Sequence, residues 1–316
     1  MIVKTNGVEL DVTEAGEGPL VVLAHGFPEL AYSWRHQIPA LAGAGYHVVA
    51  PDQRGYGRSS RPEPVEAYDV HQLTTDLLGV LDALGEERAV FVGHDWGSIV
   101  ASNQVVLHPE RVTALVNMSV PFIPRSQIAP TTAFRNLFGD NFFYMLYFQE
   151  PGRADAELNG DPARTMRRLL AARMSGDGGL PDPAMFANDG RGFIDRIAEP
   201  SGLPGWLTQA ELDHYIAEFT RTGFTGGLNW YRNLDRNWET TAAYAGATVP
   251  VPSLFIGGTL DPVIMMSPPA AAHPSLSDHR GDVLIEGAGH WVQQEAPAAV
   301  NDALIGFLND LHLRSS

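Results

Sequence analysis

The chain has 316 residues, of which 44% are hydrophobic and 18% are charged, an ordinary balance for a globular protein able to bury a large core. Its formal net charge is −16, from 37 acidic and 21 basic residues, and such a surface repels phosphate backbones and anionic lipid. Nucleic-acid and membrane partners are therefore not expected. The absence of cysteine excludes a disulfide framework, a thiolate nucleophile and a cysteine-ligated metal.

The N-terminus shows no apolar stretch after a basic start, so no signal peptide is expected. The longest apolar runs are too short to span a bilayer. A cytoplasmic location is the resulting expectation. The sequence predicts no cofactor and no metal site, and it leaves the oligomeric state open, with a homodimer among the options.

The first half of the chain alternates between strands and helices. Asn6 and Gly7 predict a hairpin turn, because both residues tolerate positive φ. Residues 73–84 carry leucines at helical spacing and end before Gly85, a helix stop signal. Continuous valine-rich runs are typical of central strands that are covered on both faces of a parallel sheet, and they span residues 20–24, 47–50, 89–92 and 112–120.

The pattern changes after Pro121. From about residue 123 to residue 246 the chain shows no strand of this kind, and helix-like stretches (164–174 and 208–222) are broken by Gly/Pro loops such as residues 178–183. These features predict a helical insertion, or cap, over residues 123–246.

The strand pattern resumes at residues 252–257 and 282–286, and a closing helix is predicted over residues 296–311. The sequence therefore predicts one doubly wound α/β core that is formed by residues 1–122 and 247–316 and interrupted by the cap.

Residues 93–97, Gly-His-Asp-Trp-Gly, follow a predicted strand and precede a helical segment. They have the form Gly-x-nucleophile-x-Gly of a nucleophile elbow, which needs glycines because strand and helix meet at a tight, strained turn. The usual central residue is serine, but here it is Asp95. The alternative is a Gly-rich turn with a surface aspartate, since short motifs recur by chance. The strand–turn–helix setting argues against that alternative.

A carboxylate in this position changes the chemistry that the site favours, because it is already ionised near neutral pH. Its attack on an ester or amide carbonyl would give an anhydride. Its attack on a saturated carbon that carries a leaving group gives a stable ester, which water can later cleave. Asp95 therefore indicates epoxides or alkyl halides as substrates rather than esters.

The acid and the base of such a site follow the nucleophile in chain order. His290 is the candidate base, because it alone among the eleven histidines follows a late strand in a loop of small residues. Asp261 follows the strand predicted over residues 252–257 and would hold the imidazole tautomer and stabilise the imidazolium. The preceding core strand offers Asn117 and no carboxylate. The alternatives are a solvated loop histidine and an Asp-Pro turn residue.

The segment His25-Gly26-Phe27-Pro28 follows the first parallel strand, where this type of fold supplies one N–H group of an oxyanion hole. The expected donors are the backbone N–H groups of Phe27 and Trp96. Residues 52–59 (DQRGYGRS) contain neither GxxxxGK[ST] nor GxGxxG, so they are interpreted as a structural loop near the site rather than a phosphate loop.

Taken together, these residues resemble the epoxide hydrolases of the α/β-hydrolase superfamily, of the soluble, bacterial type, over nearly the whole chain. The resemblance implies an α/β-hydrolase fold: a mostly parallel sheet with helices on both faces and an inserted helical cap. It also implies a cis peptide bond before Pro28 and no additional N-terminal domain like that of mammalian soluble relatives. The matching segments are HGFPE (25–29), residues 34–59, GHDWG (93–97), YMLYFQEPG (144–152) and NWYRN (229–233).

The resemblance assigns a role to each matching residue. It makes Asp95 the nucleophile, Asp261 and His290 its charge-relay partners, and Tyr144 and Tyr231 the pair that holds the ring oxygen. A phenol has a pKa near 10, so it stays protonated at neutral pH and can donate first a hydrogen bond and then a proton. The alternative is that both tyrosines are aromatic core residues of the cap.

The substrate would be a small apolar epoxide, which Asp95 opens to a hydroxyalkyl ester that water, activated by His290, then cleaves to a vicinal diol. The resemblance also places residues beside this substrate. Pro28, Met145 and Trp230 are the expected pocket residues, and Met145 stands where some relatives carry a polar residue. Tyr147 lies in the same segment as Tyr144, and the preference for Tyr144 rests on the match alone.

Two other functions compete with this hypothesis. A haloalkane or haloacid dehalogenase would use the same nucleophile, base and acid, with indole N–H groups binding the halide. Trp96 and the cap residues Trp206, Trp230 and Trp238 offer such groups, although paired tyrosines suit an oxygen leaving group better. A non-catalytic relative that binds an apolar ligand under the cap is the alternative of another class, but pure binding does not require a base.

Overall fold

The computed structural model describes residues 1–172 and 183–313. Its centre is an eight-stranded sheet with the order β1-β2-β4-β3-β5-β6-β7-β8. β1 and β2 pair antiparallel with their neighbours, and every other pair in the sheet is parallel. The strands are β1 (Ile2–Thr5), β2 (Val8–Ala15), β3 (Leu20–Ala24), β4 (His47–Pro51), β5 (Ala89–His94), β6 (Val112–Met118), β7 (Val249–Gly258) and β8 (Leu276–Ile285).

Helices cover both faces of the sheet. Alternate residues of β3 pack into different hydrophobic clusters, with Val22 in one and Val21 and Leu23 in the other, because successive side chains of a strand point to opposite faces. This explains why all five residues of β3 are buried and apolar. The helices of the core are α1 (Gln37–Gly43), α2 (Val70–Leu84), α3 (Trp96–Leu107), α11 (Pro262–Met266), α12 (Val292–Glu295) and α13 (Pro297–Asp310).

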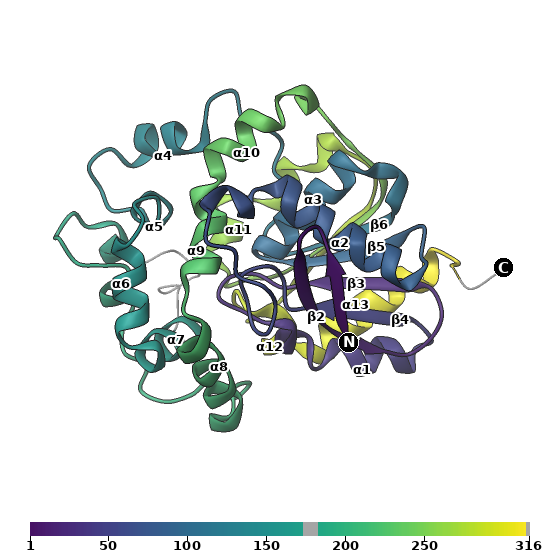
Figure 1. The fold of residues 1–316 in the computed structure, drawn as a ribbon, viewed down its shortest axis with the longest axis horizontal. Coiled ribbons are helices and arrows are strands. Elements are labelled where there is room, and N and C mark those ends of the chain that lie inside the picture. The colour runs from purple at the N-terminus through teal and green to yellow at the C-terminus, as the bar shows by residue number, and fades with distance from the viewer. Residues whose placement is uncertain (173–182, 314–316) are drawn as a thin grey trace.

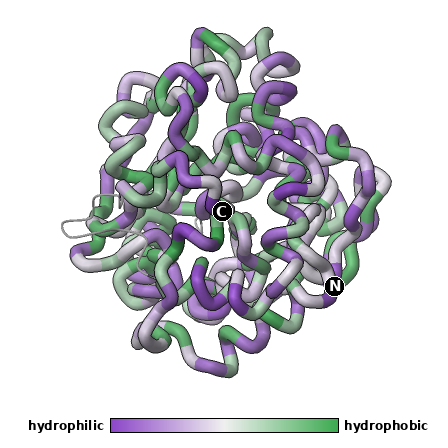
Figure 2. Tube along the Cα trace, turned by 90° about the vertical axis from the view of Figure 1, so that its left-hand side faces the viewer, coloured by the Kyte–Doolittle hydropathy of each residue, from purple (hydrophilic) through white to green (hydrophobic). Residues whose placement is uncertain are grey.

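The described part of the chain between β6 and β7 contains helices and no strand. In Figure 1 these helices, coloured teal to green, lie mainly to the left of the sheet. The tube on that side alternates hydrophilic and hydrophobic segments, as expected of helices with one buried face (Figure 2). The cap helices are α4 (Pro130–Phe138), α5 (Tyr144–Tyr147), α6 (Arg153–Gly160), α7 (Pro162–Ala171), α8 (Gln209–Thr222), α9 (Thr225–Arg232) and α10 (Leu234–Thr240).

The elements predicted from the sequence are present, with shifted ends. The hairpin turns at Asn6 and Gly7, whose φ values are 45° and 74°. The largest difference is β8, which begins six residues before residue 282, the predicted start. The end of the helix predicted over residues 164–174 and most of the loop at 178–183 lie outside the described residues, and the limits 122/123 and 246/247 of the cap stay a prediction.

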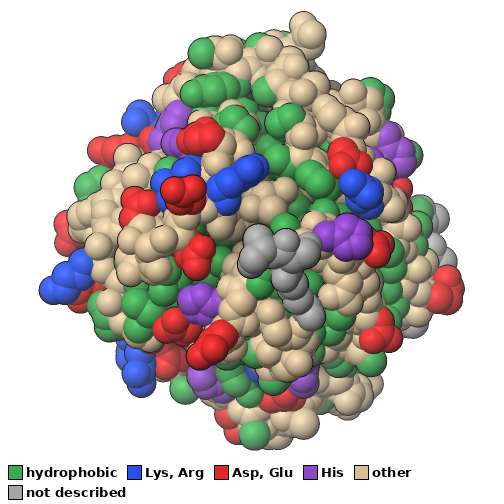
Figure 3. All heavy atoms as spheres, turned by 90° about the vertical axis from the view of Figure 1, so that its right-hand side faces the viewer, with side chains coloured by type: hydrophobic (Ala, Val, Ile, Leu, Met, Phe, Trp, Pro, Cys, Tyr) green, Lys and Arg blue, Asp and Glu red, His purple; other side chains and the backbone are tan. Residues whose placement is uncertain are grey.

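The surface carries mixed charge. On the face shown in Figure 3, Lys and Arg side chains are scattered among Asp and Glu and form no continuous basic patch. Within residues 1–172 and 183–313, no helix has the length and hydropathy needed to cross a bilayer.

Candidate active site

The elbow at the end of β5 holds Asp95 in a strained conformation. Its φ is 51°, in the left-handed region that non-glycine residues rarely adopt, and its residue position is the N-cap of α3. The flanking positions must be glycine because there is no room for a Cβ atom at either of them. A Cβ on Gly93 would lie 2.2 Å from the carbonyl oxygen of Gly97, and a Cβ on Gly97 would lie 1.9 Å from that of Ala24. The packing of β3, β5 and α3 therefore fixes where the Asp95 carboxylate stands.

One oxygen of this carboxylate is bound by the loop after β3. The backbone N–H of Phe27 donates to Oδ1 of Asp95 at 2.8 Å. Gly26 allows this approach, because a Cβ there would lie 2.4 Å from Cβ of Asp95. Trp96 is the first residue of α3, so its backbone N–H has no acceptor within the helix. The N-terminal end of a helix also favours negative charge.

The other oxygen faces a histidine. Nε2 of His290 lies 3.7 Å from Oδ2 of Asp95, and its Nδ1 lies 3.0 Å from Oδ2 of Asp261. Asp261 is fully buried, and its Oδ1 also accepts the N–H of Val263 at 2.9 Å. Because the carboxylate of Asp261 can only accept, Nδ1 carries a proton and Nε2 faces the nucleophile.

The two carboxylates control the charge of His290. Burial by itself lowers the pKa of the imidazole, but Asp261 and then Asp95 raise it well above its usual value of 6.5. Both carboxylates therefore favour the protonated form of His290 in the resting site.

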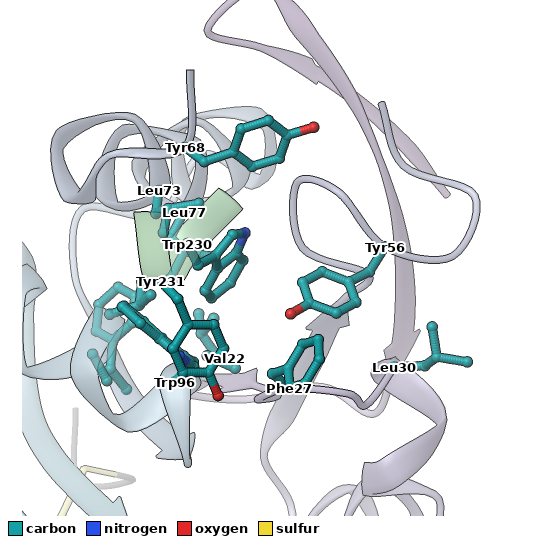
Figure 4. Packing of buried hydrophobic residues seen from close by; sticks show 14 of the residues in the cluster. Val22, Phe27, Leu30, Tyr56, Tyr68, Leu73, Leu77, Trp96, Trp230 and Tyr231 are labelled. Carbon is teal, nitrogen blue, oxygen red and sulfur yellow. The ribbon is translucent and has the colours of Figure 1, made fainter. Parts of the chain in front are cut away.

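Two phenols of the cap lie across from Asp95. The rings of Tyr144 on α5 and Tyr231 on α9 are 6.0 Å apart, and Tyr231 packs edge-on against Trp96 at 5.0 Å and Phe27 at 5.4 Å. Figure 4 shows Tyr231, Trp96 and Phe27 gathered together. Burial raises the pKa of both phenols above 10, and the negative charge of Asp95 raises each pKa further. Both phenols therefore stay protonated, and both lie close enough to Asp95 to interact with its charge.

Tyr147 points elsewhere. The guanidinium of Arg153 lies over its ring at 4.8 Å. Burial and a hydrogen bond to Glu157 raise the pKa of its phenol to about 12. The structure thus separates Tyr147 from Tyr144, which the sequence pattern alone could not do.

The three expected pocket residues differ in position. Met145 follows Tyr144 on α5 and is partly exposed, while Pro28 is buried after a cis peptide bond at Phe27–Pro28, as the resemblance implied. Trp230 is fully buried, its N–H donates to the carbonyl oxygen of Arg54 at 3.1 Å, and its ring packs against Trp96 at 5.9 Å. Trp230 therefore packs between the core and Trp96, and its place in the substrate pocket stays a prediction.

The sequence analysis missed a buried polar network behind the site. Nδ1 of His94 lies 2.7 Å from Oε2 of Glu29, and its Nε2 lies 2.7 Å from the main-chain oxygen of His290. The other oxygen of Glu29 accepts the side-chain amides of Gln293 and Gln294, each at 2.9 Å. Glu29 and His94 belong to the motifs HGFPE and GHDWG, and that membership is the only signal that could have pointed to them.

The segment of residues 52–59 supports the loop that carries Phe27. The backbone N–H of Gln53 donates to Nε2 of His25 at 3.0 Å, and the side-chain amide of Gln53 donates to the carbonyl oxygen of His25 at 2.6 Å. Burial lowers the pKa of His25 and keeps its ring neutral. The interpretation of this segment as a structural loop agrees with these contacts.

The start of α9 touches the core with its backbone. A Cβ on Gly226 would lie 2.4 Å from the carbonyl oxygen of Gly55, and a Cβ on Gly227 would lie 2.6 Å from both the Phe27 ring and the Tyr56 hydroxyl. Tyr231 follows on the same helix, so its position is tied to the core.

A carboxylate elbow, a His–Asp pair and an N–H donor at the carboxyl ends of parallel strands define a hydrolase of the α/β class. The sequence pattern described as alpha/beta hydrolase fold matches residues 19–297. The chain is 63% identical to Epoxide hydrolase A of Mycobacterium tuberculosis over 322 aligned residues, which cover 99% of this chain and 98% of that protein.

Solved structures of epoxide hydrolases are also similar to this chain. A crystal structure of Epoxide Hydrolase A from Mycobacterium thermoresistibile matches with a TM-score of 0.95 and 61% identity, over 98% of this chain and 97% of that one. An epoxide hydrolase from an endophytic Streptomyces matches with a TM-score of 0.94 and 45% identity, over 99% and 95% of the two chains. The chain belongs to the epoxide hydrolases of the α/β-hydrolase fold family.

Proposed function

We propose that this enzyme converts small apolar epoxides into vicinal diols through a covalent hydroxyalkyl ester on Asp95. The observation that carries the proposal is the arrangement around that carboxylate, with the N–H of Phe27 at 2.8 Å, the imidazole of His290 at 3.7 Å and two protonated phenols that sense its charge. Aromatic neighbours of the phenols, Phe148 and Phe193, suit an apolar substrate.

In the first half-reaction, Oδ2 of Asp95 attacks a ring carbon. The new C–O bond forms as the ring C–O bond breaks, and the electron pair moves to the ring oxygen. Tyr144 and Tyr231 donate hydrogen bonds to this oxygen, and one of them transfers a proton to it. The proton that His290 releases once Asp95 is esterified passes through solvent to the resulting tyrosinate and restores the phenol. Oδ1 remains on the N–H of Phe27 throughout.

In the second half-reaction, His290 accepts a proton from water, whose oxygen attacks Cγ of Asp95. The oxyanion that develops on Oδ1 is stabilised by the N–H groups of Phe27 and Trp96. Collapse breaks the bond between Cγ and the alkyl oxygen, which takes the proton from His290 and leaves as the diol, and the new carboxyl group of Asp95 returns its own proton to His290. Esterification removes one of the two negative charges that raise the pKa of His290, so the pKa falls when a neutral base is required.

A trapping experiment tests the covalent intermediate. In His290→Gln the first half-reaction remains, and the ester should accumulate, raising the intact mass of the protein by the mass of the epoxide. Wild-type enzyme in a single turnover in H₂¹⁸O should carry the label in Asp95. A label in the first diol, with no mass increase in the variant, would show direct attack by water.

Two of the three cap indole groups named above already donate hydrogen bonds within the protein, which disfavours the dehalogenase alternative. The N–H of Trp230 is used by the carbonyl oxygen of Arg54, and that of Trp238 by the carbonyl oxygen of Ser126 at 2.9 Å. Parallel measurement of halide release and diol formation separates the two reactions. Tight ligand binding without turnover of any epoxide in a broad panel would instead favour the non-catalytic relative.

A further inference from the structure

A second cluster of chemically active side chains lies at the far edge of the sheet. Nε2 of His273 is 2.9 Å from one oxygen of Asp282, and Nε2 of His279 is 2.8 Å from the other. The two imidazole rings are 4.6 Å apart. Over residues 1–172 and 183–313, this is the one group of three His, Cys, Asp or Glu side chains whose ligand atoms all lie within 4.8 Å of one another.

A β-bulge creates this arrangement. In a regular strand, residues three apart point to opposite faces. His279 pairs with Ser253 and Asp282 with Phe255, so β8 advances three residues while β7 advances two, and both side chains reach the same side. Gly281 provides the turn with a φ of 134°, a conformation that side chains disfavour. His273 joins from the short 3-10 helix η9 (His273–Ser275) that leads into β8.

We propose that His273, His279 and Asp282 bind one divalent cation of the zinc class, with water completing the coordination. Two imidazoles and a carboxylate are typical zinc ligands, with bonds of about 2.0–2.2 Å and ligand atoms roughly 3.3 Å apart in tetrahedral geometry. The two imidazoles contact different oxygens of Asp282, so a bound ion requires the contacts of 2.8 and 2.9 Å to open by about half an ångström and the two ring nitrogens, which lie within 4.8 Å of each other, to approach.

The surroundings of His279 support the proposal. Its Nδ1 lies 3.4 Å from the hydroxyl of Ser253, which can accept the Nδ1 proton and so leave the Nε2 lone pair for a cation. The side chains of His279 and Asp282 are mostly buried, with exposed fractions of 15% and 20%, so their orientation is set by packing. His273 is 41% exposed and leaves the site open to solvent.

The position of the cluster indicates what the cation does. β8 is the edge strand of the sheet, and it leads through residues 286–289 into His290. A cation that joins His273 of η9 to the bulge of β8 stabilises this edge. We therefore expect a structural site that does not take part in the reaction at Asp95.

The proposal is tested by zinc titration of the whole chain after metals have been removed with EDTA. Calorimetry measures the binding, and thermal unfolding measures its effect on stability. Wild-type protein should bind one equivalent of Zn²⁺ with a rise in Tm and should not bind Mg²⁺, which prefers oxygen ligands. His273→Ala and Asp282→Asn should lose the binding, and Ser253→Ala should weaken it about 10- to 100-fold. His47→Ala is the matched control, because His47 of β4 pairs with a carboxylate, that of Glu14 on β2, outside the cluster, and this variant should bind zinc as the wild type does.

Absence of zinc binding by the wild type would overturn the proposal, as would binding retained in both His273→Ala and Asp282→Asn. His273 is the safest position to change, because its side chain is the most exposed of the three. Diol formation in the metal-free variants reports whether they fold. Because zinc binding is measured without substrate, its result is independent of the proposed function.

Discussion

Nε2 of His94 lies 2.7 Å from the main-chain oxygen of His290. The other ring nitrogen of His94 faces the carboxylate of Glu29, so both ring nitrogens must donate when Glu29 is ionised. Burial would raise the pKa of Glu29, but the charge of His94 and their hydrogen bond lower it to about 2. A fully buried ion pair thus holds the backbone of the catalytic histidine.

Glu29→Gln should destabilise the protein by about 3–5 kcal/mol, because it leaves the charge of His94 buried and unpaired. Glu14→Gln is the matched control: Glu14 also pairs with a histidine at 2.8 Å, but its side chain is 39% exposed, and its loss should change stability by about 0–1 kcal/mol. Urea unfolding followed by tryptophan fluorescence measures both. Equal effects of the two substitutions would contradict the role of the buried pair.

The same pair predicts acid sensitivity. The pKa of Glu29 is lower in the folded chain than its ordinary value of 4.5, so its contribution is complete above pH 4.5 and is lost as the pH falls towards 2. The difference in unfolding free energy between wild type and Glu29→Gln should therefore shrink over this window. A difference that stays constant from pH 6 to pH 3 would argue against the ion pair.

Tyr144→Phe and Tyr231→Phe should each lower kcat/KM for an epoxide, because each removes one donor to the ring oxygen. General acid catalysis is worth about 10²–10⁴-fold, and the remaining phenol should keep single variants near the lower limit. The double variant should fall further. Tyr147→Phe, one turn away on α5 and directed at Glu157, should keep nearly full activity in a diol assay.

Asp95→Asn should lower the pKa of His290 towards its ordinary value, because it removes one of the two anions that raise it. NMR titration of the His290 ring measures the shift. Because the folded pKa of His290 lies above the unfolded one, the charged ring stabilises the folded chain fully below about pH 6.5. This stabilisation is lost as the pH rises through the folded pKa. A His290 pKa that is the same in both proteins would show that Asp95 does not control the base.

Gly226→Ala should separate α9 from the core, because the new Cβ would lie 2.4 Å from a backbone oxygen that cannot move freely. We expect a loss of about 1–3 kcal/mol in stability and a clear loss of turnover. Gly306→Ala, in α13 with open space around the added Cβ, should instead stabilise by about 0.5–1 kcal/mol. Thermal unfolding and diol formation distinguish the two.

Much of the core could be predicted because local pattern decides it. The valine-rich runs, the turn at Asn6 and Gly7 and the Gly-x-Asp-x-Gly motif around Asp95 can each be recognised within a few residues of sequence. β8 was predicted too short because its polar residues and the bulge at Gly281 interrupt the alternation that marks a strand.

The longer-range features could not be read from the sequence. Glu29 and His94 are 65 residues apart, and a charged residue is usually at the surface, so nothing local signals their pairing. His279 and Asp282 are three residues apart and reach the same side only through the bulge. Tyr144 and Tyr147 are the same residue type on the short helix α5, and only the direction of each side chain distinguishes their roles.

The glycines at the start of α9 have a mechanical consequence. Backbone packs directly on backbone where Gly226 meets Gly55, with no side chain between them. A side chain added at Gly226 would therefore displace the main chain of α9, and Tyr231 on the same helix with it. The distance between this phenol and the nucleophile thus depends on a contact that involves neither of them.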